Sequence, residues 1–183
     1  KGHHLLERFD LVDGLPRWRW RIGDVVIERE IAMTHGRPAV AVVHRLIAGS
    51  GVRLALEALC TWRDQHGERH ADGPPPRVVP TADGAVVEQA YRMAGPGWTP
   101  AGQWWRGAHH REEAARGLAS EEDIWYAGRF GGTLDAPGDT LEVLAWAGDL
   151  DDRPAPATEV VAAARERHWQ VIAAATPADP VDA

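Results

Sequence analysis

The segment from Leu56 to His70, LEALCTWRDQHGERH, carries the densest group of side chains that could do chemistry. A mostly apolar run, suited to the interior of a sheet, is followed at once by cations, carboxylates and imidazoles. These residues are Arg63, Asp64, His66, Glu68, Arg69 and His70. Such side chains serve in metal binding, in acid–base catalysis, in recognition of sugar hydroxyls, or in the ion pairs of a solvated loop.

The histidine spacings do not predict a metal site. His66 and His70 are four positions apart, and His109 is adjacent to His110. A pair with the first spacing binds zinc when a helix puts both rings on one face and a third ligand is present. The segment around His66 is flanked by glycine and proline, which predicts a loop. We therefore expect surface or core histidines, and no metal or other cofactor.

Acid–base catalysis would require paired carboxyl groups. An inverting glycosidase holds an acid and a base about 6.5–9.5 Å apart. The available residues are Glu112, Glu113, Glu121, Glu122 and Asp123. Adjacent glutamates are typical of a solvated helix face, so we expect no catalytic residue in this chain. A mutarotase needs a base and an acid near the sugar's C1, and His66 with a carboxylate could supply them.

Sugar recognition is the interpretation that we favour for this cluster. Arg63 and Asp64 could form a paired donor and acceptor set of the kind that holds sugar hydroxyls, with His66 beside them. The chain also has nine tryptophans against two tyrosines and two phenylalanines. Tryptophan serves either in a β-rich core or as a platform for a pyranose ring. Trp104 or Trp105 is the predicted platform, and an ion pair that holds the strand end is the alternative role of the cluster.

Composition limits the class of protein. The chain has 183 residues, 44% of them hydrophobic and 26% charged, which is typical of one large globular domain, or of one domain with an appendage. The net charge of −7 argues against nucleic acid and against an anionic membrane surface as partners. Cys60 is the only cysteine, and no signal peptide or apolar run of transmembrane length is present. We expect a cytoplasmic protein, although a segment upstream of Lys1 could have carried a signal.

Alternation of apolar and polar residues predicts five strands in the first third of the chain. They cover residues 5–12, 17–22, 25–34, 39–48 and 52–62. In the second of them, Trp18, Trp20 and Ile22 share one face, and Arg17, Arg19 and Arg21 share the other. Because the connections are short, with a tight turn at Gly23-Asp24, the pattern predicts an antiparallel meander.

The rest of the chain is less regular. We expect a loop over 64–76, a hairpin around Asp83-Gly84, a short helix within 110–120, and two short strands around Pro137-Gly138. A helix is predicted from Thr158 to Ala175, with Thr158 as its cap. Residues 176–183 break this helix and are typical of an interdomain linker.

Three segments, taken in order, resemble the N-terminal domain of the bacterial and archaeal type of glycogen debranching enzyme, an amylo-α-1,6-glucosidase. They are GHHLLERFDLVDGLPRWRWRIGDVVIEREIAMTHGRPAVAVVHRL, LEALCTWRDQH and RGLASEEDIWYAGRF. The resemblance implies a large antiparallel β-sandwich, a supersandwich like that of galactose mutarotases and bacterial glucoamylases. A linker helix then leads to a separate (α/α)6 barrel, which carries the catalytic carboxylates in this family.

On this basis, residues 1–156 are expected to form the sandwich, and residues 157–183 the helix and linker toward the barrel. The family's usual first strands, with a "Y.GLL"-like motif, would lie upstream of Lys1, and the barrel would lie downstream of Ala183. The expected function is that of a non-catalytic module that helps to position branched α-glucan, either glycogen or a maltooligosaccharide, for the barrel of the same parent chain. Two alternatives remain: a purely structural domain that supports the barrel, and a standalone mutarotase-like enzyme.

Overall fold

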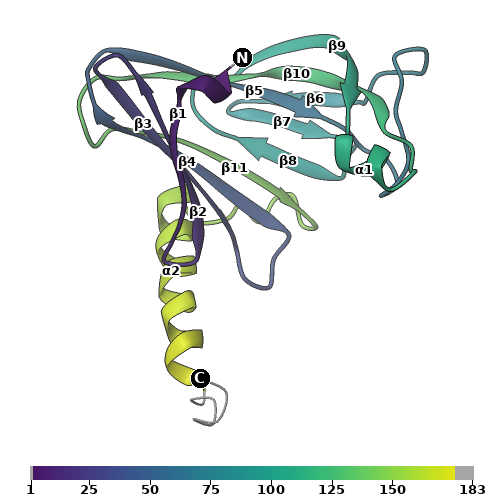
Figure 1. Ribbon diagram of the computed structural model, residues 1–183. Helices are drawn as coiled ribbons and strands as arrows, with labels where there is room; N and C mark the ends of the chain where they lie inside the picture. Colours follow the sequence, from purple (N-terminus) through teal and green to yellow (C-terminus); the bar gives the residue numbers. More distant parts are fainter. Residues whose placement is uncertain (1, 176–183) are drawn as a thin grey trace.

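The computed structural model describes residues 2–175, which form two antiparallel β-sheets with helices beside them (Figure 1). The large sheet has eight strands in the order β1-β2-β3-β4-β11-β8-β7-β6, and the small sheet has three in the order β5-β10-β9. The predicted mainly β fold with a C-terminal helix is therefore confirmed. The strands of the large sheet are β1 (Leu6–Val12), β2 (Leu15–Ile22), β3 (Val25–Met33), β4 (Ala39–Ala48), β6 (Val78–Thr81), β7 (Gly84–Val87), β8 (Tyr91–Ala94) and β11 (Thr140–Ala147). The remaining elements are β5 (Val52–Cys60), β9 (Thr99–His109), β10 (Glu121–Leu134), the short 3-10 helix η1 (Gly2–Leu5), α1 (Arg111–Ala115) and α2 (Ala157–Ala174).

The first strands follow the predicted meander only in part. Strands β1 to β4 are neighbours in chain order, but β5 leaves the large sheet and pairs with β10 in the small one. The prediction is therefore correct for four strands and wrong for the fifth. The reason lies in the connection, where Gly49 and Gly51 adopt positive φ angles of 94° and 61°. Glycine takes such angles without a steric penalty, so the turn can send the chain across to the second layer.

The small sheet covers one face of the large sheet, which we call the inner face. Between the two layers, β5 and β10 contribute Ala58, Phe130 and Leu134 to an apolar core. The large sheet supplies its side of this core from β3, β4, β7, β8 and β11, for example Leu46 and Leu141, which are almost fully buried. Strands β1 and β2 contribute no buried residue to the core between the layers, so the small sheet covers only part of the inner face.

Helix α2 lies on the opposite, outer face of the large sheet. Its first turns bury Val160 and Val161 against β3, β4 and β11, beside Trp146. Thr158 was predicted to cap this helix, and that prediction is wrong. The helix begins after Pro156 with no side-chain cap, and the backbone N–H of Thr158 donates to Glu142 of β11. A carboxylate from the sheet therefore satisfies one of the free N–H groups of the first turn.

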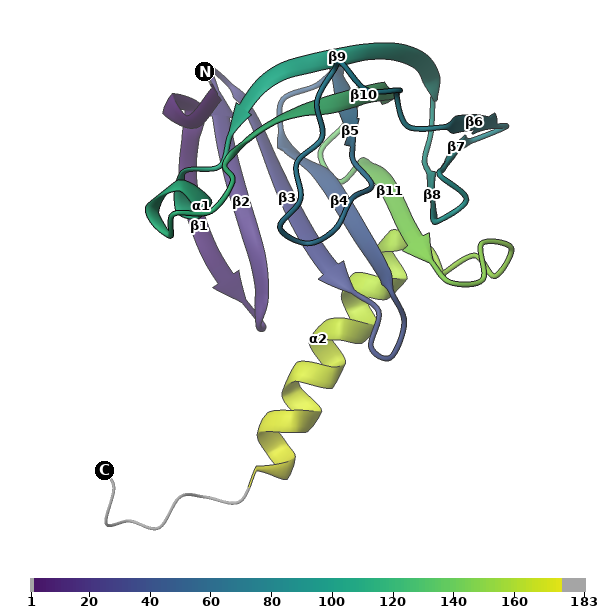
Figure 2. The same ribbon diagram turned by 90° about the vertical axis from the view of Figure 1, so that its right-hand side faces the viewer.

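The second half of α2 extends away from both sheets (Figures 1 and 2). Trp169, Val171 and Ile172 are about half exposed there. The predicted linker over 176–183 lies outside the residues that the structure describes. Within the described residues, no helix is both long enough and apolar enough to cross a membrane.

The two faces of β2 differ as the alternation predicted. On the outer face, Arg17 pairs with Glu30 of β3, and Arg19 pairs with Glu28 of β3 and Glu7 of β1. Arg165 of α2 also contacts Glu30, so an ion-pair network ties the helix to the sheet. Trp18 and Trp20 point to the inner face, beyond the edge of the small sheet.

Candidate functional site

Arg63 leaves the sandwich just after the end of β5 and binds a carboxylate on β10. Its Nε donates to Oε2 of Glu122 over 2.7 Å, and its Nη2 donates to Oε1 over 2.8 Å. Its Nη1 donates to the backbone carbonyls of Asp64 and Gln65, each at 3.0 Å. This two-point contact is the strongest geometry available to an arginine and a carboxylate. Arg63 therefore holds the first residues of the loop against the start of β10.

Glu122 is the centre of this cluster and is only 3% exposed. Besides Arg63, the ring Nε2 of His110 lies 2.7 Å from its Oε1. The hydrogen bonds from Arg63 hold the pKa of Glu122 below its usual value, although burial acts in the opposite direction. The same contact raises the pKa of Arg63. Both groups are therefore charged at neutral pH.

Asp123 connects the neighbouring loop to the same hairpin. It lies at a register shift between β9 and β10, and its carboxylate accepts the backbone N–H groups of Gly107 and Ala71, each at 2.8 Å. These backbone hydrogen bonds lower the pKa of Asp123. Its own N–H donates to the carbonyl of Arg69. Asp123 thus fixes the loop from residue 61 to residue 77 beside the tip of the β9–β10 hairpin.

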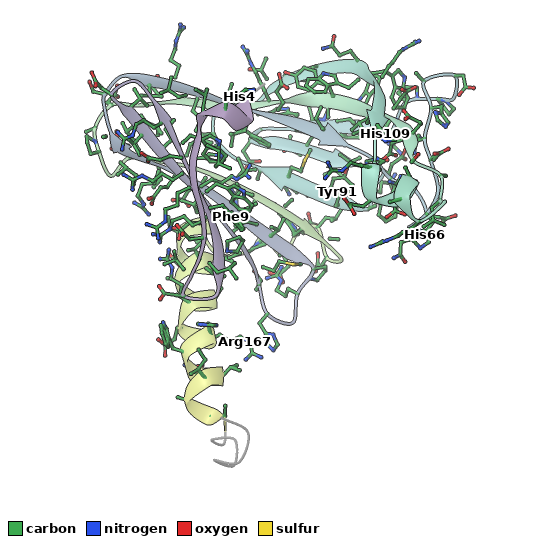
Figure 3. The ribbon with its side chains drawn as sticks, in the orientation of Figure 1. His4, Phe9, His66, Tyr91, His109 and Arg167 are labelled. Carbon is green, nitrogen blue, oxygen red and sulfur yellow. The ribbon has the colours of Figure 1, made fainter. Side chains whose placement is uncertain are left out.

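His66 lies on the outer side of the cluster, near α1 (Figure 3). Its Nδ1 is 3.7 Å from Oε2 of Glu113, and its side chain is largely exposed. His66, Arg63 and Glu122 line a polar pocket of about 170 Å³. Ligand pockets usually measure about 300–1,000 Å³. This pocket is too small to enclose an oligosaccharide.

The structure does not bring Asp64 into the paired set that the sequence suggested. Its carboxylate makes no hydrogen bond within residues 2–175, and Arg63 meets only its backbone carbonyl. Glu122 takes the place that Asp64 was expected to fill.

The two predicted tryptophans point in opposite directions from β9. Trp104 packs edge-on against Trp125, with ring centres 5.2 Å apart, and so faces the core. Trp105 is 46% exposed on the outer surface of the small sheet, opposite Ile124 of β10. Of the two, Trp105 offers a free ring face, and it lies on the same hairpin as Glu122.

Glu122 and Asp123 do not suit the role of the general acid in glycoside hydrolysis. A general acid must be protonated near neutral pH, which requires a raised pKa. Glu122 and Asp123 both have lowered pKa values, because cations or backbone N–H groups bind them. The histidines do not converge on a metal position either: no group of three histidine, cysteine, aspartate or glutamate side chains with ligand geometry occurs among the described residues. The arrangement can hold a loop in place and present polar groups at a rim.

The chain matches the model of a known protein family. The family model described as "Glycogen debranching enzyme N terminal" matches residues 1–141, which include β1 to β10 and the start of β11. The matched region contains Arg63, Glu122 and Trp105. A search of curated proteins found no significant match.

Proposed function

The chain belongs to the family of glycogen debranching enzyme N-terminal domains, and from this premise we propose that it is a non-catalytic module that positions branched α-glucan. The reaction itself, hydrolysis of α-1,6 bonds, would take place in an (α/α)6 barrel of the parent chain. The family match over residues 1–141 is the observation that carries this proposal. The lowered pKa values of Glu122 and Asp123 support the non-catalytic part of it, because both carboxyl groups are poor proton donors.

The polar pocket lined by Arg63, Glu122 and His66, with the exposed ring of Trp105 on the same β9–β10 hairpin as Glu122, is where we place one contact with glucan, and we call these four residues the rim. His66 and Trp105 are both open to solvent there. Arg63 already has acceptors for its donors, so its main role is to fix the loop that carries His66. A shallow site of this kind gives weak binding, since each hydrogen bond to a sugar hydroxyl replaces one to water and contributes about 0.5–1.5 kcal/mol.

Binding to the rim is tested with Trp105→Ala. We expect the 183-residue chain to bind maltoheptaose with a millimolar dissociation constant, or about −4 kcal/mol. Loss of one stacking platform should weaken binding about fivefold, or roughly 1 kcal/mol. NMR titration measures both constants, and Trp169→Ala on α2 is the matched control because Trp169 is equally exposed and far along the chain from the rim. If the two variants bind maltoheptaose with equal affinity, Trp105 does not contact the glucan.

The absence of hydrolysis is a separate expectation. Incubated with a limit dextrin, the purified chain should release no glucose in a coupled assay, because the contact with Arg63 lowers the pKa of Glu122 and so makes it a poor proton donor. Glucose release that Glu113→Gln abolishes and Glu112→Gln leaves intact would contradict the non-catalytic role. The pair is well matched, since both glutamates lie in α1 and only Glu113 lines the rim pocket.

A second candidate function is support of the barrel without contact to sugar. The exposed side chains Trp169, Val171 and Ile172 on the projecting half of α2 favour it, because such a surface is suited to packing against another domain. The two candidates differ in one measurement: a domain that only supports the barrel shows no chemical shift change with maltoheptaose at tens of millimolar.

A further inference from the structure

A row of four side chains crosses the inner face, from the uncovered strands β1 and β2 to the cleft beside β5. Strand register places Phe9 of β1 beside Trp18 of β2, Trp18 beside Arg29 of β3, and Arg29 beside His44 of β4. Cross-strand partners share a face. The next partner of His44 is Leu141, which lies in the core between the sheets, so the whole row points inward. Phe9 marks its outer end, on the other side of the molecule from His66 (Figure 3).

Arg29 has no partner for its charge in this row. Its guanidinium carbon lies 4.2 Å from the ring centre of Trp18 and 5.1 Å from that of Trp20. It makes no ion pair or hydrogen bond within residues 2–175, and its Nε is buried without an acceptor. On the outer face of the same strands, by contrast, Arg17 and Arg19 pair with carboxylates. An unsatisfied buried donor carries a penalty unless a ligand or water supplies the acceptor.

His44 is the second polar group of the row without a partner. His44 is only 7% exposed, and the Nδ1 of its ring has no hydrogen-bond partner. Burial, with a smaller contribution from Arg29, lowers its pKa to about 4, so the ring is neutral at pH 7. A neutral imidazole can donate at one nitrogen and accept at the other.

Both groups open into a cleft of about 480 Å³ between the inner face and β5. This volume lies within the usual range for small-molecule sites and exceeds that of the rim pocket. Arg29, Val42 and His44 line one wall, residues 55–58 of β5 line the other, and Met93, Phe130 and Val143 form an apolar floor. β5 is the edge strand of the small sheet, so its free backbone groups face the same space.

We propose that this cleft binds a glucose unit of an α-glucan, as a second contact site of the module, and this rests on the proposed function. A pyranose ring has apolar faces and a rim of hydroxyls. Its faces match the apolar floor of Met93, Phe130 and Val143, and its hydroxyls match Arg29 and His44.

The cleft favours a neutral ligand over an anionic one. Arg29 already lies against the negative faces of two indole rings. Apart from Arg29 and His44, the side chains that face the cleft are apolar, because Glu57 of β5 alternates with the core residues Leu56 and Ala58 and is exposed on the other face of the small sheet. Hydroxyls suit this lining, because they accept a hydrogen bond from Arg29 and donate one to His44.

The test is a titration of the 183-residue chain with maltoheptaose, followed through the indole N–H signals of its tryptophans. The indole N–H signals of Trp18 and Trp20 are assigned with the variants Trp18→Phe and Trp20→Phe. Both signals should shift during the titration, and the dissociation constant fitted to them should equal the one fitted to most other shifting signals. Arg29→Leu should weaken the binding that moves these signals at least tenfold. Arg53→Leu is the matched control: it removes the same charge from an exposed position on β5 outside the cleft, and should change the affinity less than twofold.

Three results would contradict glucan binding in the cleft or the proposed function on which it rests. If the Trp105 signal shifts while those of Trp18 and Trp20 remain still, glucan binds at the rim alone and the cleft is not a sugar site. If glucuronate moves the Trp20 signal at a tenfold lower concentration than glucose does, the cleft receives an acidic group of a partner. If no tryptophan signal moves, the proposed function itself fails. Because the wild-type signals are read directly, these outcomes hold even where Arg29→Leu does not fold.

Discussion

Replacing Glu122 by glutamine should destabilise the fold by about 3 kcal/mol. The glutamine has the shape of the glutamate but leaves Arg63 with no negative partner and turns an amide N–H₂ toward one of its donors. Breaking a buried ion pair costs about 3–5 kcal/mol. We expect the lower end, because the side chain of Arg63 is about one quarter exposed and water screens part of the loss. In a chain of this length, the melting temperature should fall by about 6–12 °C.

Thermal unfolding followed by circular dichroism measures this effect, and Glu112→Gln is its control. Glu112 is close in sequence and makes the same charge change, but its side chain is largely exposed, so we expect a change within about 0.5 kcal/mol. The double variant Arg63→Met with Glu122→Gln should lose less stability than the two single variants lose in sum. In the double variant no buried charge is left without its partner. A melting temperature of Glu122→Gln equal to that of the control would mean that Arg63 does not hold the loop.

The partner of Arg63 could not be predicted from the sequence. Glu122 lies 59 positions away along the chain, and the nearer Asp64 offered a more obvious pairing. The glutamates around Glu122 resemble a solvated face, and the register shift at Asp123 breaks the alternation that would have placed Glu122 in a strand. The contact exists because β5 and β10 are neighbours in the small sheet, and the sequence pattern of β5 is the same whichever sheet it joins.

The faces of β2 and β3, in contrast, could be predicted from the alternation of apolar and polar residues in the sequence. It placed Trp18 and Trp20 on one face of β2, and the same alternation in the sequence of β3 puts Arg29 on one face with Ile27 and Ile31. An arginine on an otherwise apolar face is a signal that a partner or a ligand is needed. What the sequence could not show is that the ring of His44 lies next to Arg29, or that both groups face a cleft beside β5 without a hydrogen-bond acceptor for the Nε of Arg29.

Trp104 and Trp105 illustrate the same limit. Adjacent residues of a strand point to opposite faces, so only one of them can be a platform on a given surface. The segment around them carries too little alternation to be recognised as a strand, and both therefore remained candidates. The structure resolves the choice through Trp125, which occupies the core side of the sheet and packs against Trp104.

His44 should make the fold sensitive to mild acid. Its pKa is about 4 in the folded chain, chiefly because of burial, with Arg29 acting in the same direction, and about 6.5 when the chain is unfolded. Between these values the unfolded chain binds the additional proton, so the free energy of unfolding decreases as the pH falls. The contribution of His44 is fully present above pH 6.5 and is lost progressively as the pH falls toward 4. The loss between pH 7.5 and pH 5 should be about 2 kcal/mol.

The pH window separates His44 from the carboxylates whose pKa values are shifted. Glu122, Asp123 and Glu30 have lowered pKa values, so their contributions are lost only as the pH falls below about 4.5, the ordinary range for carboxyl groups. Arg29 from β3 is the charged group that acts on the ring of His44, whereas Glu57 of β5 alternates with the core residues Leu56 and Ala58 and so points to the other face of the small sheet. Arg29 stays charged over this range, and Glu57 is exposed at the edge of the small sheet.

The measurement is the urea midpoint at several pH values between 7.5 and 5, for the wild type and for His44→Gln. Glutamine keeps a polar group in the cleft but cannot be protonated, so its curve should stay flat where the wild-type midpoint falls. The melting temperature of the wild type should fall by about 4–8 °C over the same range. His66→Gln is the control, because the side chain of His66 is largely exposed at the rim, and its curve should follow the wild type. If His44→Gln and the wild type lose stability in parallel, the ring of His44 is not enclosed in the way that the structure describes, and the cleft would then be open to water on this side.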